Sequence, residues 1–330
     1  MEQRQLGKTG PMVSALGLGA MGMSGMYGPA DRQESLATIH AALNAGVTLI
    51  DTGDFYGMGH NEMLIGEALK GVKRDKAVVS VKFGALRDPG TGWIGFDARP
   101  AAMKTFLSYS LQRLGLDYID IYRPARLDPA VPIEETVGAM AEMVKAGFIR
   151  HIGLSEVGAE TLRRAAAVHP ICDLQIEYSL ISRGIEDAIL PTARELGIDI
   201  TAYGVLSRGL ISGHWQKSSV AEGDFRAHSP RFQDGNIDAN LALVDALRKV
   251  ADALGASVAQ VAIAWVMARG KDIVPVIGAR RRDRLAEALG AMDLSLSADD
   301  LAAIERAVPR GAAAGDRYAA VQMSHLDSEK

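Results

Sequence analysis

Three ionisable residues lie where apolar segments of the sequence give way to polar loops. Asp51 directly follows one apolar run, Tyr56 comes five residues later, and Lys82 follows the next apolar run. A phenol exchanges protons poorly at neutral pH because its ordinary pKa is about 10. A nearby ammonium lowers that pKa, and a carboxylate holds the ammonium in place. Together the three residue types suit general acid catalysis, such as protonating the alkoxide formed when a carbonyl is reduced, although each alone is commonly an ordinary loop residue.

A repeating unit of apolar strand, polar loop and amphipathic helix must position these residues. Eight runs are nearly continuously apolar, as expected for parallel strands that are buried on both faces. These predicted strands are Ala15–Gly19, Val47–Ile50, Ala77–Val81, Tyr118–Tyr122, His151–Leu154, Leu174–Glu177, Asp199–Tyr203 and Ile273–Val276. Helices are predicted between them, for example over Asp31–Ala45, where Asp31 and Glu34 resemble a capping box and Gly46 is placed to end the helix.

Eight strands that alternate with helices, with no Pro/Gly/Ser-rich linker between them, predict one α/β domain over residues 1–330 with the (β/α)8 TIM-barrel fold. The opening segment Gln3–Ser14 predicts a β-hairpin that caps the barrel floor. Helices at Asn240–Leu254 and Ala298–Ala307 are two extra to the repeat. The longest irregular stretch is Ser207–Asp238, and connections of such length are usually functional or disordered. Because active sites of such barrels lie where the strands end, the three ionisable residues are expected to meet at the barrel mouth.

Composition and charge exclude several classes of protein. The net charge of −4 argues against a nucleic-acid-binding protein, which usually has a basic balance. The single cysteine, Cys172, excludes an intramolecular disulfide and a thiolate metal site, and none of the seven histidines suggests a ligand cluster, so no metal is predicted. Residues 1–10 lack the apolar segment of a secretory signal, and no apolar run of about 18 residues occurs. We therefore expect a cytoplasmic protein that has no membrane partner.

Residues 17–22 match the G-x-G-x-x-G fingerprint of dinucleotide-binding Rossmann domains. In that fold the third glycine lies within a helix whose N-terminus holds the pyrophosphate. Here the segment Met23–Pro29 follows, and its two glycines and its proline are incompatible with a helix. Asp51, the candidate ribose-binding acid, comes 29 residues after Gly22 rather than about 20. The pattern therefore disfavours a Rossmann domain, and the glycines are interpreted as allowing a ligand to approach the first strand.

Ordered motifs along the whole chain resemble those of the aldo-keto reductase family, in its bacterial and plant branch. The most specific is Asp-Thr-Gly-Asp-Phe-Tyr-Gly at 51–57, followed by Gly-His-Asn-Glu at 59–62. The other motifs are Gly-Leu-Gly-Ala-Met-Gly-Met at 17–23, Val-Lys-Phe-Gly at 81–84, Ile-Gly-Leu-Ser at 152–155, Gln-Ile-Glu-Tyr-Ser at 175–179 and Ala-Tyr-Gly-Val-Leu-Ser-Arg-Gly at 202–209. The resemblance implies a barrel that reduces carbonyls with NADPH. Its catalytic residues would be Asp51, Lys82 and the proton donor Tyr56.

The same resemblance implies cofactor-binding positions around the barrel mouth. Ser155 and Gln175 would hydrogen-bond the nicotinamide carboxamide, and Tyr203 would stack on the ring. Further positions along the cofactor would be Gly19, Ala20, Met21, Gly204, Leu206, Ser207, Arg208, Gly209, Gly278, Arg280, Arg284 and Glu287. Guanidinium groups suit phosphate because their donors are forked and always charged, so the arginines near the 2′-phosphate favour NADPH over NADH. The plainer alternatives are a core aromatic for Tyr203 and a solvated helix start for the arginines.

Three positions depart from the family pattern. Ala125 stands where the family usually has a histidine that orients the carbonyl and donates a hydrogen bond to its oxygen. Losing one such donor costs on the order of 10²–10³ in rate. Glu156 replaces a small polar residue beside the carboxamide, and Ala288 replaces an asparagine near the adenine. For Ala125 three explanations stay open: a natural variant that handles a bulkier substrate, with water or Arg123 filling the space, a deliberately disabled enzyme, or a sensor of the cofactor.

The sequence therefore predicts an NADPH-dependent oxidoreductase that reduces aldehydes or ketones to alcohols. The alternative is a cofactor-binding redox sensor of the same fold with little turnover, which Ala125 favours. The expected partner is a small carbonyl compound, and no oligomeric state is predicted. Loop residues that suggest an apolar or aromatic substrate are Met21, Met23, Met26, Tyr27, Phe55, Trp93 and Trp215.

Overall fold

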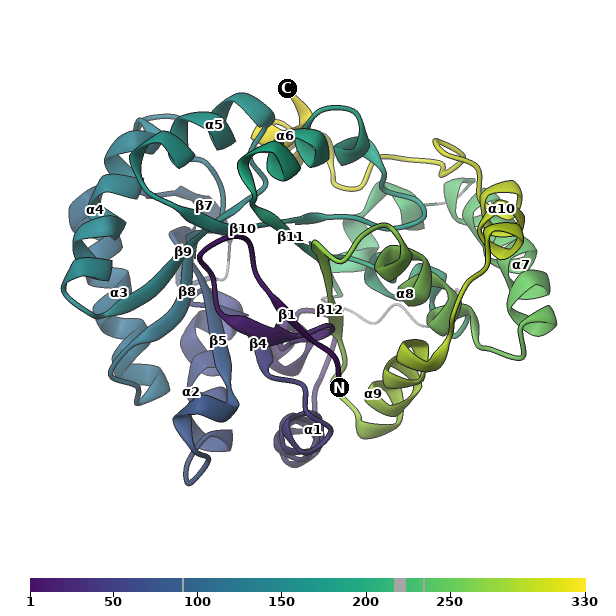
Figure 1. The fold of residues 1–330 in the computed structure, drawn as a ribbon, viewed down its shortest axis with the longest axis horizontal. Coiled ribbons are helices and arrows are strands. Elements are labelled where there is room, and N and C mark those ends of the chain that lie inside the picture. The colour runs from purple at the N-terminus through teal and green to yellow at the C-terminus, as the bar shows by residue number, and fades with distance from the viewer. Residues whose placement is uncertain (91, 217–223, 234) are drawn as a thin grey trace.

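Eight parallel strands close into a barrel in the computed structural model of the protein, which describes residues 1–90, 92–216, 224–233 and 235–330 (Figure 1). In order around the barrel the strands are β10 (Ile171–Glu177), β11 (Asp199–Tyr203), β12 (Ile273–Gly278), β3 (Gly17–Gly19), β4 (Leu49–Gly53), β5 (Val78–Phe83), β8 (Ile119–Pro124) and β9 (Ile149–Ser155). β9 pairs with β10 and closes the ring. Each predicted strand overlaps one of these, so the predicted (β/α)8 barrel is confirmed.

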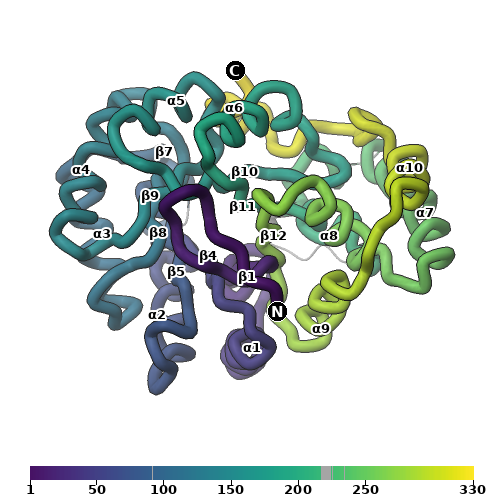
Figure 2. Tube along the Cα trace, viewed as in Figure 1, coloured from purple at the N-terminus to yellow at the C-terminus, as the bar shows by residue number. Residues whose placement is uncertain are grey.

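Helices surround the barrel (Figure 2). Those that alternate with the strands are α1 (Arg32–Asn44), α2 (His60–Ala68), α3 (Pro100–Leu114), α4 (Ile133–Lys145), α5 (Ala159–Val168), α6 (Ile189–Leu196), α8 (Val258–Ala268) and α9 (Arg282–Leu289). The start of α1 is as predicted, because the Asp31 side chain accepts a hydrogen bond of 2.7 Å from the N–H of Glu34. Such a cap satisfies a donor that the first turn of the helix leaves unpaired.

The amino-terminal segment forms the predicted hairpin. Its antiparallel strands are β1 (Gln3–Gln5) and β2 (Met12–Ser14), and Figure 1 shows the hairpin in purple across one end of the barrel. In its turn the N–H of Lys8 donates to the carbonyl oxygen of Gly197 at 3.1 Å, just before β11 begins. The hairpin therefore covers the end where the strands start and leaves the opposite end, the mouth, uncovered.

The two predicted extra helices are present as α7 (Asn236–Ala253) and α10 (Ala298–Ala307), which pack against each other beside the barrel (Figure 1). A second hairpin, β6 (Ala85–Arg87) with β7 (Trp93–Phe96), and a short helix α11 (Ala320–Met323) were not predicted. Short 3₁₀ helices occupy Met21–Ser24, Tyr56–Gly59, Arg74–Lys76, Gly184–Glu186, Ser207–Ser212, Phe225–His228, Pro230–Phe232, Gly290–Asp293 and Asp327–Glu329.

In the described part of the chain, no single helix is long and apolar enough to cross a membrane. α7 and α8 meet that length and composition only when taken together, as a pair bent by 86°.

The glycine-rich segment after β3 does not continue into an α-helix. It forms the 3₁₀ helix Met21–Ser24, which ends at Gly25 with a φ of 83°. A Rossmann fingerprint requires an α-helix whose N-terminus faces the pyrophosphate at this point. The closed barrel and this short helix confirm that the fingerprint is coincidental.

Candidate active site

Asp51 and Lys82 form a buried ion pair at the carboxyl ends of neighbouring strands. Pairing of β4 with β5 places Gly53 opposite Lys82, so both charged side chains reach the barrel mouth. The Lys82 Nζ lies 2.5 Å from Asp51 Oδ2. Ser80 Oγ and Gln175 Nε2 donate to Asp51 Oδ1 at 2.9 and 2.7 Å. Three donors therefore fix the carboxylate, and the carboxylate in turn fixes the ammonium.

Tyr56 lies beside this ion pair, in the turn that follows β4. The Lys82 Nζ is 5.2 Å from the centroid of the Tyr56 ring, and 6% of the tyrosine is exposed. Phe55 packs edge-on against the ring with the centroids 4.8 Å apart. The next residues, Gly57 and Met58, have φ values of 56° and 54°, which turn the chain sharply after the tyrosine. The structure thus brings together the three residues that the sequence predicts to transfer a proton.

The electrostatic environment of Tyr56 differs from the one expected. Burial raises the pKa of Tyr56 well above 10, and the negative charge of Asp51 raises it further. Burial also lowers the pKa of Lys82, while the Asp51 carboxylate acts in the opposite direction. The expected lowering of the Tyr56 pKa by Lys82 is therefore outweighed, because a phenolate would be desolvated and would face a carboxylate. Tyr56 consequently keeps its proton at neutral pH.

The two positions assigned to the nicotinamide carboxamide lie opposite each other on adjacent strands, Ser155 at the end of β9 and Gln175 near the end of β10. Ser155 is 1% exposed, and its hydroxyl oxygen has no hydrogen-bond partner among the described residues. A buried polar atom without a partner is rare and costly, so it indicates a place for a ligand. Gln175 differs, because its amide group donates to Asp51 and so supports the ion pair. Ser155 therefore fits the predicted role more directly than Gln175 does.

The segment Leu206–Gly209 after β11, which would follow the pyrophosphate, has a strained backbone. Ser207 and Arg208 adopt left-handed φ values of 47° and 57°. Non-glycine residues in that region cost about 1–3 kcal/mol each, and such strain is common at ligand clamps. Before the segment, Gly204 has a φ of 66°, and an added Cβ would lie 3.0 Å from Glu177 Cγ. The remaining predicted positions, Gly19, Ala20, Met21 and Gly278, follow or end β3 and β12 at the same mouth.

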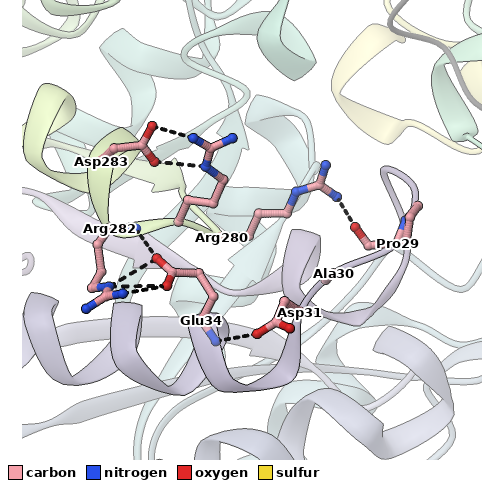
Figure 3. Close-up of a pocket in the computed structure, with 8 residues that line it drawn as sticks. Pro29, Ala30, Asp31, Glu34, Arg280, Arg282 and Asp283 are labelled. Carbon is pink, nitrogen blue, oxygen red and sulfur yellow. Dashed lines mark hydrogen bonds and ion pairs between the residues drawn. The ribbon is translucent and has the colours of Figure 1, made fainter.

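A surface pocket of about 670 Å³ lies between the loop before α1 and the start of α9 (Figure 3). Three consecutive arginines line it, and two of them are neutralised by carboxylates. Arg281 is bound to Asp283, and Arg282 is bound to Glu34. The Arg280 guanidinium instead donates to main-chain carbonyl oxygens of residues 27–29 at 3.0–3.2 Å. Arg280 thus keeps a positive charge that no carboxylate among the described residues neutralises through an ion pair.

Arg284 and Glu287, also predicted to hold the adenosine end of the cofactor, do not line this pocket. They bind each other at 3.1 Å. Glu287 also lies 2.9 Å from the His214 ring nitrogen. Of the predicted arginines on this side, Arg280 is therefore the one that the pocket includes.

The carboxyl-terminal segment contributes residues to the mouth that the sequence did not predict. Arg317 binds both oxygens of Glu156 at 2.8 and 2.6 Å, and both side chains are buried. Tyr203 donates to Glu156 at 2.7 Å, and its hydroxyl lies 2.9 Å from that of Tyr318. The segment, yellow in Figure 1, runs from α10 toward α5, where Asp327 accepts a hydrogen bond of 2.8 Å from the backbone of Gly158. It therefore closes one side of the mouth.

Arg123 does not fill the space beside Ala125. Its Nη2 donates to both oxygens of Asp173 at 3.0 and 2.8 Å, and both side chains are 0% exposed. Asp173 is level with Asp199, the first residue of β11, so Arg123 extends into the barrel toward the strand starts. Gly153 makes room for the pair, because an added Cβ would lie 2.8 Å from Arg123 Nε. The explanation in which Arg123 replaces the histidine is therefore wrong.

A closed eight-stranded barrel with an ion pair and a tyrosine at its mouth has the architecture of the barrel enzymes, whose active sites lie at the carboxyl ends of the strands. A sequence model of the Aldo/keto reductase family matches residues 15–309. A probable aldo-keto reductase 1 of Glycine max is 41% identical over 316 residues, which cover 95% of this chain and 91% of the relative. The chain belongs to the aldo/keto reductase family.

Solved structures of the same family have similar folds. A glycerol dehydrogenase of Gluconobacter oxydans superposes with a TM-score of 0.83 at 30% identity, over 92% of this chain and 94% of the other. An aldo-keto reductase of Klebsiella pneumoniae in complex with NADPH superposes with a TM-score of 0.75 at 29% identity, over 94% of this chain and 96% of the other.

Proposed function

We propose that the protein is an NADPH-dependent reductase that converts aldehydes or ketones to alcohols. The observation that carries the proposal is the Asp51–Lys82 ion pair buried beside Tyr56 at the barrel mouth. Membership of the aldo/keto reductase family supports it, as does the relative that was solved with NADPH.

The residues of the site have separate tasks in this reaction. NADPH supplies a hydride to the carbonyl carbon when it is bound. The Tyr56 hydroxyl gives its proton to the carbonyl oxygen, so that the product is a neutral alcohol. The Lys82 ammonium lies beside the resulting phenolate and stabilises its charge until a proton from solvent restores the hydroxyl. Asp51 acts through Lys82, because its carboxylate holds Nζ at 2.5 Å.

The chain also has features that fit NADPH. The unpartnered Ser155 hydroxyl at the mouth suits a carboxamide, and Arg280 in the surface pocket suits a phosphate. The pocket and the strand ends lie on one side of the barrel, because Arg280 comes two residues after the end of β12. Ser155 would hold the nicotinamide end, and Arg280 would hold the 2′-phosphate.

A second candidate function is a redox sensor that binds the cofactor with little turnover. Ala125 favours it, because a buried methyl group offers no hydrogen bond to a carbonyl oxygen. One measurement separates the reductase from the sensor: the decrease in NADPH absorbance in the presence of a panel of aromatic aldehydes and small ketones. We expect turnover with members of the panel. Tight binding of NADPH without turnover of any member would instead favour the sensor.

Replacing Arg280 by alanine should weaken NADPH binding by roughly 10- to 100-fold, because one or two charge-assisted hydrogen bonds to the 2′-phosphate are lost. NADH has no 2′-phosphate, so its affinity should change little. The matched comparison is Arg281→Ala, which removes a guanidinium that Asp283 already neutralises and should have a smaller effect. Fluorescence titrations with NADPH and with NADH measure the ratio of the two dissociation constants. An unchanged NADPH/NADH preference in Arg280→Ala would refute the phosphate assignment.

A further inference from the structure

Arg126 lies at the barrel mouth and immediately follows Ala125, whose side chain cannot donate a hydrogen bond to a substrate carbonyl. The N–H of Ala125 donates to the carbonyl oxygen of Phe83 at 2.8 Å, so the pairing of β8 with β5 extends one residue beyond β8. Because Lys82 lies opposite Arg123 and Phe83 lies opposite Pro124, residues 125 and 126 follow just beyond the level of Lys82, on the mouth side. The Arg126 side chain folds back, with Nη1 donating to the carbonyl oxygen of Ala125 at 2.6 Å. Its guanidinium lies 5.9 Å from the centroid of the Tyr318 ring.

The charge of Arg126 has no matching carboxylate. Within the described parts of the chain, no carboxylate oxygen lies within ion-pair distance of its guanidinium, although the side chain is partly buried. Glu156 is near enough to act on it electrostatically. That carboxylate is already held by the two hydrogen bonds from Arg317. Arg126 is therefore a partly buried cation without an ion-pair partner among the described residues, and it is available to negative charge that a ligand or a reaction brings to the mouth.

Arg126 is also close to the proton donor. Burial raises the pKa of Tyr56, and the positive charge of Arg126 acts against that rise. The same charge contributes to lowering the pKa of Lys82, after the larger effect of burial. Tyr56, Lys82 and Arg126 lie at or just after the carboxyl ends of the neighbouring strands β4, β5 and β8, so the guanidinium is on the same side of the mouth as the proton donor.

We propose that Arg126 is a catalytic residue whose guanidinium donates a hydrogen bond to the substrate carbonyl oxygen and stabilises its developing negative charge. This role rests on the reductase function proposed above. Guanidinium is suited to it because it is always charged and presents several donors, of which Arg126 uses one for Ala125. A donor that faces the position of developing charge stabilises the transition state more than the ground state.

Arg126→Gln tests the proposal, because glutamine keeps much of the side chain and removes the charge. We expect kcat to fall by about 10²–10³-fold, with the NADPH dissociation constant and the unfolding midpoint close to those of the wild type. The fall in kcat should be smaller for Arg126→Lys, because lysine keeps the positive charge. The matched control is Arg164→Gln, which removes a surface guanidinium that binds Glu134 on α4 and should leave kcat unchanged.

Two further readouts separate catalysis from structural support. Millimolar guanidinium chloride should restore part of the activity of Arg126→Ala, whereas equal sodium chloride should not. Without turnover, Arg126→Gln should bind benzoate, a stable mimic of a charged oxygen, more weakly in the NADP⁺ complex. Unchanged kcat in Arg126→Gln, or a change in KM alone, would overturn the proposal while leaving the reductase function intact. A wild-type protein that turns over no carbonyl would overturn both.

Discussion

Replacing Tyr56 by phenylalanine is expected to lower the rate of carbonyl reduction by about 10²–10⁴-fold, the usual contribution of a general acid. The ring keeps its edge-on contact with Phe55 and its position beside Lys82, so only the donated proton is lost. NADPH affinity should therefore stay nearly unchanged. Steady-state kinetics and fluorescence titration with NADPH measure the two quantities on the same preparation.

The matched control for this change is Tyr109→Phe on α3. Tyr109 is 54% exposed and lies outside the barrel, so removing its hydroxyl should change neither rate nor affinity. If Tyr56→Phe lost rate and NADPH affinity in equal measure, the hydroxyl would be a structural or cofactor-binding group. If the rate stayed within about threefold of the wild type, the proton would come from another group.

The barrel could be predicted because each of its strands and helices has a local pattern in the sequence. Each parallel strand is buried on both faces and therefore appears in the sequence as a short apolar run. Residues such as Asp31 and Gly46 mark the ends of a helix. The hairpin of β6 and β7 was missed because its turn was not recognised, whereas the amino-terminal hairpin, whose strands are equally short, was predicted. The turn dipeptide Pro89-Gly90 between them was its available signal.

The Asp51, Tyr56 and Lys82 cluster could be predicted for a topological reason, since strand ends of a barrel converge. The direction of Arg123 was not predicted, although a local signal existed. Side chains alternate along a strand, so Arg123 shares the inward face of β8 with Ile121, which is buried in the barrel core. That alternation puts Arg123 inside the barrel.

The contacts of the carboxyl-terminal segment lay beyond sequence reasoning. Glu156 and Arg317 are 161 residues apart, and no periodicity or motif joins positions so distant. Their pairing depends on how the segment after α10 crosses the mouth, which is decided by tertiary packing. The sequence showed that Glu156 departs from the family pattern. It did not show that Arg317 pairs with this buried carboxylate.

This buried pair should dominate the stability of the mouth, and Arg317→Met should lower the free energy of unfolding by about 3–5 kcal/mol at neutral pH. Methionine preserves much of the side-chain volume but leaves the Glu156 carboxylate buried without its cation. Ser328 and Tyr203 still donate to Glu156 but carry no charge, and Arg126 acts on the carboxylate only from beyond ion-pair distance. Urea unfolding followed by circular dichroism measures the change.

The pH dependence distinguishes a lost charge from lost packing. Burial alone would raise the pKa of Glu156, but the charge and hydrogen bonds of Arg317 outweigh it and hold that pKa below its usual range. The pair therefore stabilises the wild type above the unfolded-state pKa of about 4.3, and this stability declines as the pH falls below that value. In Arg317→Met the pKa of Glu156 should rise instead, so the variant becomes relatively more stable as acid neutralises the carboxylate. The difference in unfolding free energy between the two proteins should therefore be larger at pH 7 than at pH 4.

The double variant Glu156→Gln with Arg317→Met completes the argument, because replacing both charges removes the cost of an unpaired carboxylate. It should recover most of the stability that Arg317→Met loses, since buried pairs are often matched by neutral groups of similar size. Glu156→Gln alone leaves Arg317 with Glu329 at 2.7 Å as a partner, so its loss should be smaller than that of Arg317→Met. Two results would mean that Arg317 stabilises the mouth through packing rather than through charge. One is a difference in unfolding free energy between the wild type and Arg317→Met that does not change with pH, and the other is a double variant no more stable than Arg317→Met.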